Sequence, residues 1–181
     1  IKATSITAHG EEGSTFCVDI DGREYEVKVP LIGRHNIYNA LASIAVGRVY
    51  NVEMDRIISG IALFKPEKMR LDIFEVKGIK VINDCYNASP ESMRAALSVL
   101  MQIKSDGRKI AILGDMLEMG QWATQAHREV GEEVKKCGVD YLITVGYNGK
   151  DIAKGAIDAG MSANRVFSFD SNDEVIQKID G

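Results

Sequence analysis

The sequence of 181 residues has little of what marks membrane, nucleic-acid-binding or secreted proteins. No apolar run approaches the roughly 18 residues that a membrane-spanning helix needs. The net charge of −4, with no basic stripe, gives no reason to expect a nucleic-acid partner. The three cysteines are odd in number, far apart and free of CxxC spacing, which argues against a disulfide framework or a zinc site and fits a reducing cytoplasm.

Both ends of the chain lack features of a complete protein. The first residue is isoleucine rather than methionine, and the chain opens on a predicted strand without a secretory signal pattern. The last residue, Gly181, directly follows a predicted helix, where an α/β fold would continue with another strand. We therefore expect the chain to be truncated at both ends.

The first third of the chain predicts strands followed by two helices. Residues 15–21 and 23–31 alternate like strands around Asp21-Gly22, a strong hairpin signal, and residues 5–9 are a further strand candidate. Helices are predicted over residues 35–50 and 54–63. The apolar positions expected to form the buried face of the first helix are Tyr38, Leu41, Ala42, Ala45, Val46 and Val49.

The pattern changes at Pro66, which disfavours helix at the preceding residue and is taken as the domain boundary. Residues 71–76 and 79–84 read as a second hairpin around Lys77-Gly78. Beyond it, helices and strands alternate. Helices are predicted over 92–103, 123–137, 151–159 and 172–179, and strands over 108–114, 140–146 and 165–169, the first of these three buried. This alternation predicts an α/β fold with a mostly parallel sheet that helices cover on both faces.

The stretch Val81–Met93 holds most of the polar chemistry, because a strand ends there and a helix begins. Ligands of open α/β sheets collect at such places. The Asp84 carboxylate could accept two hydrogen bonds from a ribose diol, or could only hold the loop as a turn residue. Asn87 could bind a backbone-like substrate amide, or form an Asx turn. Ser89 is the predicted N-cap of the helix, with Pro90 in its first turn.

Candidate ligand-binding residues also lie outside this stretch. Arg70 could reach a phosphate or ribose from the domain boundary, although a surface ion pair is the simpler interpretation. Asn36 and Asn39 share a face of the first helix and could bind an adenine edge. The alternative is that Asn36 caps this helix and His35 is simply hydrogen-bonded.

Two loops resemble nucleotide-binding motifs but fail on spacing. Residues 146–151, GYNGKD, follow a strand and open a helix, yet Thr144 replaces the first glycine of a phosphate loop and Asp151 replaces its Ser/Thr. Residues 114–120, GDMLEMG, do not match GxGxxG. In that second loop Asp115 and Glu118 could meet a cationic amine, or could only be solvated.

Three stretches resemble the Mur ligases: GRHNIYNALASIAV (33–46), the run from Phe64 to Leu97, and ILGDMLEMG (112–120). The motifs DxYNAxPxSM and LGDMxExG most resemble those of one branch of that family, which joins D-alanyl-D-alanine to UDP-N-acetylmuramoyl-tripeptide. The resemblance implies that residues 1–65 are the C-terminal part of a central ATP-binding domain. It implies that residues 66–181 are a Rossmann-like C-terminal domain that lacks its last strand.

The same resemblance implies roles for individual residues. It places His35, Asn36 and Asn39 at the adenine of ATP, Arg70 at the ribose and phosphates, and Asp84 at the ribose. It places Tyr86, Asn87 and Ala88 opposite the incoming amino substrate. His127 also matches the sequence motif of the family, but the resemblance assigns it no role.

The implied reaction is ATP-dependent amide formation through an acyl phosphate, in the bacterial cytoplasm, by a monomeric enzyme without a membrane span or nucleic-acid partner. No confident catalytic residue or metal ligand lies in these 181 residues, because the resemblance places the phosphate loop and the Mg²⁺ ligands before residue 1. We therefore expect the isolated fragment to be inactive. The alternative is a non-catalytic, nucleotide-binding Rossmann-like module.

Overall fold

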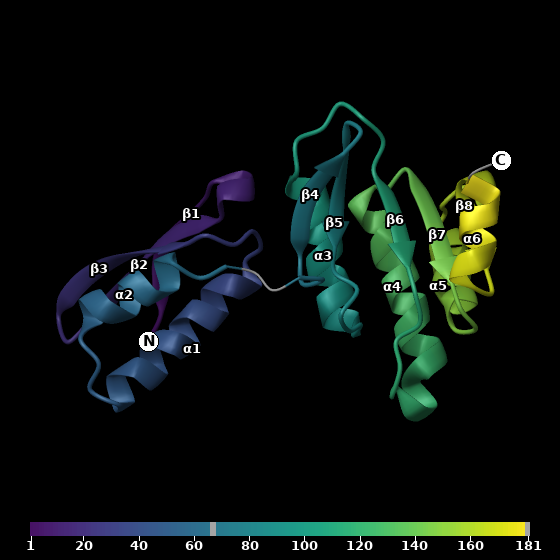
Figure 1. Ribbon diagram of the computed structural model, residues 1–181. Coiled ribbons are helices and arrows are strands. Elements are labelled where there is room, and N and C mark those ends of the chain that lie inside the picture. The colour runs from purple at the N-terminus through teal and green to yellow at the C-terminus, as the bar shows by residue number, and fades with distance from the viewer. Residues whose placement is uncertain (66–67, 180–181) are drawn as a thin grey trace. The chain divides into compact units, whose positions relative to one another are not determined.

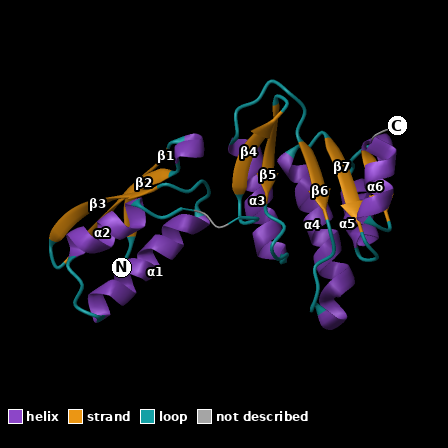
Figure 2. Cartoon of the chain, viewed as in Figure 1, coloured by secondary structure: helices purple, strands orange, loops and turns teal. Residues whose placement is uncertain are grey.

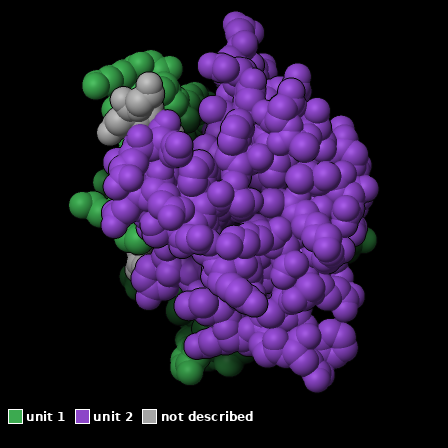
Figure 3. Space-filling model, turned by 90° about the vertical axis from the view of Figure 1, so that its right-hand side faces the viewer, with its two compact units in different colours: residues 1–83 green, residues 84–181 purple. Residues whose placement is uncertain are grey.

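The computed structural model describes residues 1–65 and 68–179, which fall into two compact units. One unit comprises residues 1–83 and the other residues 84–181 (Figure 3). The hairpin of residues 72–83 therefore groups with the first unit, where Lys80 forms an ion pair with Glu11. Pro66, at which the sequence predicts the domain boundary, lies outside the described residues, and that boundary stays a prediction.

Strands and helices occur largely where the sequence predicts them (Figures 1 and 2). In the first unit they are β1 (Ala3–Ala8), η1 (Gly10–Glu12), β2 (Ser14–Ile20), β3 (Arg23–Val29), α1 (His35–Val49), α2 (Met54–Ala62), β4 (Asp72–Val76) and β5 (Ile79–Asn83). In the second unit they are α3 (Pro90–Gln102), β6 (Ile110–Leu113), η2 (Gly120–Trp122), α4 (Ala123–Cys137), β7 (Tyr141–Val145), α5 (Gly149–Asp158), η3 (Ala163–Arg165), β8 (Val166–Phe169) and α6 (Asn172–Ile179).

Both predicted hairpins are confirmed, and their turn residues explain them. Asp21 and Gly22 have φ of 54° and 81°, and Lys77 and Gly78 have φ of 49° and 78°. Two successive residues at positive φ form a type I′ turn, whose twist matches that of the strands it joins. The turns set the registers, which pair Ile20 with Arg23 in one hairpin and β4 antiparallel to β5 in the other.

The core of the first unit lies between the sheet β1-β2-β3 and the helices α1 and α2. The sheet contributes Phe16, Val18, Val27 and Val29, and the helices contribute Ile37, Ala40, Ile44, Met54 and Ile57. The predicted buried face of α1 is therefore largely wrong, although Leu41 does pack against this core. Tyr38, Val46 and Val49 are 64%, 58% and 77% exposed. Apolar residues surround this helix, so their spacing alone does not determine which side meets the sheet.

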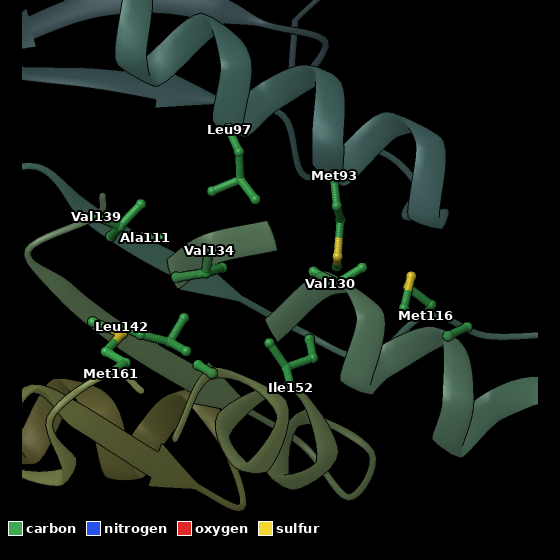
Figure 4. Close-up of a cluster of buried hydrophobic side chains, with 12 residues drawn as sticks. Met93, Leu97, Ala111, Met116, Val130, Val134, Val139, Leu142, Ile152 and Met161 are labelled. Carbon is green, nitrogen blue, oxygen red and sulfur yellow. The ribbon is translucent and has the colours of Figure 1, made fainter. Parts of the chain in front are cut away.

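The second unit contains the predicted parallel sheet, in the order β6-β7-β8. One face of this sheet packs against α3, α4 and α5, and the shared cluster includes Leu97, Val130, Val134, Leu142 and Ile152 (Figure 4). Helices α4 and α5 follow β6 and β7 and return the chain over the same face. Consecutive parallel strands joined in this way make the unit Rossmann-like in its topology.

Strand β6 is less buried than predicted. Ala111 points into the cluster, but Ile110 and Ile112, on the opposite face, are 46% and 58% exposed. Phe167, which the register places in the same row as Ile112 and Ile143, is 43% exposed. Among the described residues this face is thus only partly covered, whereas the sequence predicts helices on both faces.

Candidate nucleotide- and substrate-binding segments

Helix α3 begins as the sequence predicts, and its start fixes the preceding polar loop. The Ser89 hydroxyl accepts a hydrogen bond from the Ser92 N–H at 3.1 Å, and the Ser92 hydroxyl accepts one from the Ser89 N–H at 2.9 Å. This reciprocal capping box satisfies two backbone donors at the helix start. Pro90 occupies the first turn, where its missing N–H costs nothing.

The loop Asp84–Ala88 forms the connection between β5 and this capped helix. Asp84 and Ala88 are half-buried, Asn87 is exposed, and the Tyr86 side chain is 62% exposed. Ala88 also packs against the core cluster of the second unit. The loop is thus anchored at its helix end and presents Tyr86 and Asn87 to solvent, which suits contact with a ligand.

At the start of α1 the structure brings two of the predicted residues into direct contact. Asn36 is 8% exposed, donates its side-chain N–H to the Ile32 carbonyl at 2.9 Å and accepts from the Asn39 amide at 3.2 Å. Asn36 therefore does not cap α1, and that alternative is wrong. Asn39 is exposed, so Asn36 orients it while Asn39 faces outward. His35 is half-buried at the first position of α1.

Arg70 is exposed and stands between two residues with unusual backbone conformations. Met69 and Leu71 have φ of 65° and 48°. Left-handed backbone costs a residue with a Cβ roughly 1–2 kcal/mol, so two such residues around one arginine are a considerable local strain. Strain of this kind is found at ligand-binding segments and also in turns, so the role of Arg70 stays a prediction.

Asp115 and His127 are two further residues with specific contacts in the second unit. The Asp115 carboxylate accepts from the Gly149 N–H at 2.7 Å, and the buried His127 accepts from the Met116 N–H at 2.9 Å. The sequence alone assigns neither residue a role. One feature of the sequence does indicate that the two loops lie close together. Gly114-Asp115 and Gly146 each follow a strand of the same parallel sheet, and the carboxyl ends of parallel strands lie at one edge of the sheet.

Neither a cluster of metal ligands nor a membrane-spanning helix occurs in the part of the chain that the structure describes. No group of three His, Cys, Asp or Glu residues there could hold a metal ion. No helix there is long and apolar enough to cross a membrane.

Comparison with known families identifies both parts of the chain. Residues 69–180 match the family model "Mur ligase, glutamate ligase domain", and residues 1–47 match "Mur ligase middle domain". The chain belongs to the Mur ligase family. The family match confirms the resemblance that the motifs around Asn36, Asp84 and Asp115 predict. It also agrees with the Rossmann-like unit, because the model of the C-terminal family domain spans all of α3 to α6.

Individual relatives of this Mur ligase chain carry one shared name, UDP-N-acetylmuramoyl-tripeptide–D-alanyl-D-alanine ligase. The protein of that name from Bacillus subtilis is 34% identical over 95% of this chain and 37% of its own length. The one from Escherichia coli is 35% identical over 78% of this chain and 30% of its own length. The chain thus spans about a third of the length of these relatives.

Solved structures agree with the family assignment. A crystal structure of MurF from Acinetobacter baumannii has a TM-score of 0.85 and 28% identity, over 98% of this chain and 37% of that one. MurF ligase from Thermotoga maritima, in complex with ADP, has a TM-score of 0.69 and 23% identity over 96% of this chain and 43% of that one. At that identity the second likeness supports the fold alone.

Proposed function

We propose that this chain is part of an ATP-dependent ligase that joins D-alanyl-D-alanine to UDP-N-acetylmuramoyl-tripeptide in bacterial peptidoglycan precursor synthesis. The observation that supports the proposal most directly is the loop Asp84–Ala88. It lies between the end of β5 and the capped start of α3, and its sequence motif resembles that of the D-alanyl-D-alanine-adding branch of the family. The shared name of the relatives supports the substrate pair.

The proposed reaction has two steps. The tripeptide carboxylate attacks the γ-phosphorus of ATP, an O–P bond forms, and the bond to the bridging oxygen breaks as ADP leaves. The amine of D-alanyl-D-alanine then attacks the acyl carbon, a C–N bond forms, and inorganic phosphate leaves while the nitrogen loses a proton. Catalysis of such phosphoryl transfers rests mainly on positioning and charge neutralisation.

The described residues suit the binding parts of this reaction. Asn39, oriented by Asn36, and His35 would bind the adenine, Arg70 the ribose and phosphates, and Asp84 the ribose. Tyr86, Asn87 and Ala88 would face the amino substrate. No phosphate loop occurs in the printed sequence, so we expect residues 1–181 by themselves to show no turnover; phosphate release by the purified 181-residue chain would contradict this.

The described residues offer no cluster of His, Cys, Asp and Glu that could hold Mg²⁺, so the proposed roles of this chain are binding of the nucleotide and of the amino substrate, with no metal ligand among them. The proposal includes a monomeric state and a cytoplasmic location, in keeping with a soluble nucleotide-linked substrate.

The second candidate function is a nucleotide-binding module without catalysis, which the Rossmann-like topology alone would allow. The two candidates differ in a single measurement on the full-length gene product. Formation of ADP that requires both the tripeptide precursor and D-alanyl-D-alanine favours the ligase, whereas ATP binding without ADP formation favours the module.

Replacing Asp84 by asparagine in the full-length gene product should raise the KM for ATP about tenfold to a hundredfold. Hydrogen bonds to a charged group contribute about 1.5–3 kcal/mol, and 1.4 kcal/mol corresponds to a factor of ten. The measurement is the initial rate of ADP formation at varied ATP. Asp106→Asn is the matched control, because Asp106 is an exposed loop carboxylate of the same unit. An unchanged KM for ATP in Asp84→Asn would remove Asp84 from the nucleotide site.

A further inference from the structure

The loop that follows β6 is fixed to the start of α5 by a carboxylate. The Asp115 Oδ1 atom accepts from the Gly149 N–H at 2.7 Å, and Gly149 is the first residue of α5. The residue before it, Asn148, makes no side-chain capping bond. Asp115 thus caps α5 from another loop, where the helix macrodipole favours a negative charge.

The glycine-rich loop around Gly146 accommodates this carboxylate. Gly146 has φ of 103°, and a Cβ at that position would lie 2.5 Å from Asp115 Oδ1. The following lysine is engaged elsewhere, since the Lys150 ammonium contacts Asp170 at 2.6 Å, a hydrogen bond that raises the pKa of Lys150. The loop that resembles a phosphate loop in sequence therefore holds a carboxylate of its own chain.

His127 holds the next residue of the same loop. Its side chain is fully buried, its Nδ1–H donates to the Ala123 carbonyl at 2.6 Å, and its Nε2 accepts from the Met116 N–H at 2.9 Å. These partners require the neutral ring with the proton on Nδ1. Met116 is itself 1% exposed. Two consecutive residues are thus fixed from two directions.

The fixed loop and the segment proposed to face the amino substrate pack on the same hydrophobic cluster. Met116 and Met119 pack in the cluster that also contains Met93 and Ala88, and Figure 4 shows Met93 and Met116 at the same end of that cluster. Ala88 belongs to the Tyr86–Ala88 segment. From this base the loop presents Leu117, which is 73% exposed, and Glu118 to solvent.

We propose that His127 and Asp115 are positioning residues for the amino-substrate site of the ligation, an inference that rests on the function proposed above. They hold residues 114–120 on the hydrophobic cluster against which Ala88 also packs, and thereby fix the position of this loop beside that site. Release of the loop should weaken binding of D-alanyl-D-alanine and leave ATP binding unchanged, because the groups proposed to bind ATP lie outside this loop.

Two amide substitutions at His127 separate the contact to the loop from the contact within α4. Glutamine reaches as far as Nε2 and can accept from the Met116 N–H, whereas asparagine reaches only as far as Nδ1 and leaves that N–H without its acceptor. In the full-length gene product, His127→Asn should raise the KM for D-alanyl-D-alanine about tenfold, and His127→Gln less than about threefold. The KM for ATP should stay within about twofold in both.

Amide hydrogen exchange gives a readout of the loop that does not depend on activity. Exchange of the Met116 N–H should accelerate at least about tenfold in His127→Asn relative to His127→Gln. Val134→Ala is the matched control, since Val134 is a fully buried residue of α4 beyond His127. It should lower stability without changing the ratio of the two KM values. If His127→Asn fails to fold, Asp115→Ala tests the same loop through the Gly149 N–H.

The outcomes separate the two proposals. Absence of wild-type ligation would overturn the proposed function, and this inference with it. Wild-type ligation with an unchanged KM for D-alanyl-D-alanine in His127→Asn, despite faster Met116 exchange, would overturn this inference alone. So would equal changes of both KM values in His127→Asn and Val134→Ala, which would reduce His127 to a stabilising residue.

Discussion

Gly131→Ala is expected to destabilise the unit of residues 84–181 by about 2 kcal/mol or more, although alanine is the better helix former. Helices α4 and α5 approach so closely at this residue that their backbones are in contact. A Cβ at position 131 would lie 2.0 Å from the Ile152 carbonyl oxygen and 2.6 Å from the Ala156 nitrogen. Backbone atoms cannot move aside as a side chain can, so the helices would have to separate and open the core between them.

Two opposing contributions determine the sign of the change in the free energy of unfolding. Alanine in a helix interior gains about 1 kcal/mol over glycine, and overpacking of a well-packed core costs about 1–3 kcal/mol or more. Gly155 faces the same contact, because a Cβ there would lie 2.2 Å from the Arg128 carbonyl oxygen. Gly155→Ala should therefore destabilise the unit as well.

Gly60→Ala is the matched control for this prediction. Gly60 lies inside α2, and a Cβ there would meet nothing within 4 Å, so only the propensity term remains and stability should rise by roughly 0.5–1 kcal/mol. Urea unfolding of the chain, followed by circular dichroism, measures all three variants. A stabilising Gly131→Ala would mean that α4 and α5 do not approach as described.

Local chemistry made the turns and caps of this fold predictable. Asp21-Gly22 and Lys77-Gly78 stand between strands of matched length, and each pair takes the positive φ of a two-residue hairpin. Ser89 and Pro90 begin α3 for reasons contained within four residues. Signals of this kind involve neighbours in the sequence, so no knowledge of the tertiary structure is needed to interpret them.

The site was predictable only where its residues are contiguous. Asp84–Ala88 form one loop, and their motif and their position after a strand coincide. Asp115 and His127 could not be assigned, because their partners Gly149 and Met116 are 34 and 11 positions away in the chain. A carboxylate after a strand looks the same in sequence whether it binds a ligand or caps a helix of its own chain.

Helix α1 shows where periodicity fails. Its sequence offers apolar residues on more than one side, and the face containing Tyr38, Val46 and Val49 has the more regular spacing. The sheet instead receives the face of Ile37, Ala40 and Ile44, on which Asn36 also lies. A buried asparagine on the inner face weakens the apolar pattern there, and its hydrogen bonds to Ile32 and Asn39 are visible only in the folded chain.

Ile44→Ala is expected to destabilise the unit of residues 1–83 by about 2–5 kcal/mol, the usual cost of removing a fully buried Ile side chain. Val49→Ala, on the same helix, should change stability by less than about 0.5 kcal/mol, because Val49 is 77% exposed. Equilibrium unfolding of the 181-residue chain in urea measures both variants under the same conditions.

This pair tests the orientation of α1 directly. Alanine raises the helix propensity at both positions, so propensity cannot produce a difference of the expected size or sign. If the regular apolar spacing of α1 marked its buried face, Val49→Ala would be the costly variant and Ile44→Ala the neutral one. The structure requires the reverse order, because Ile44 is fully buried in the cluster that also contains Phe16 and Val27, and a cavity there would remove packing contacts from this core.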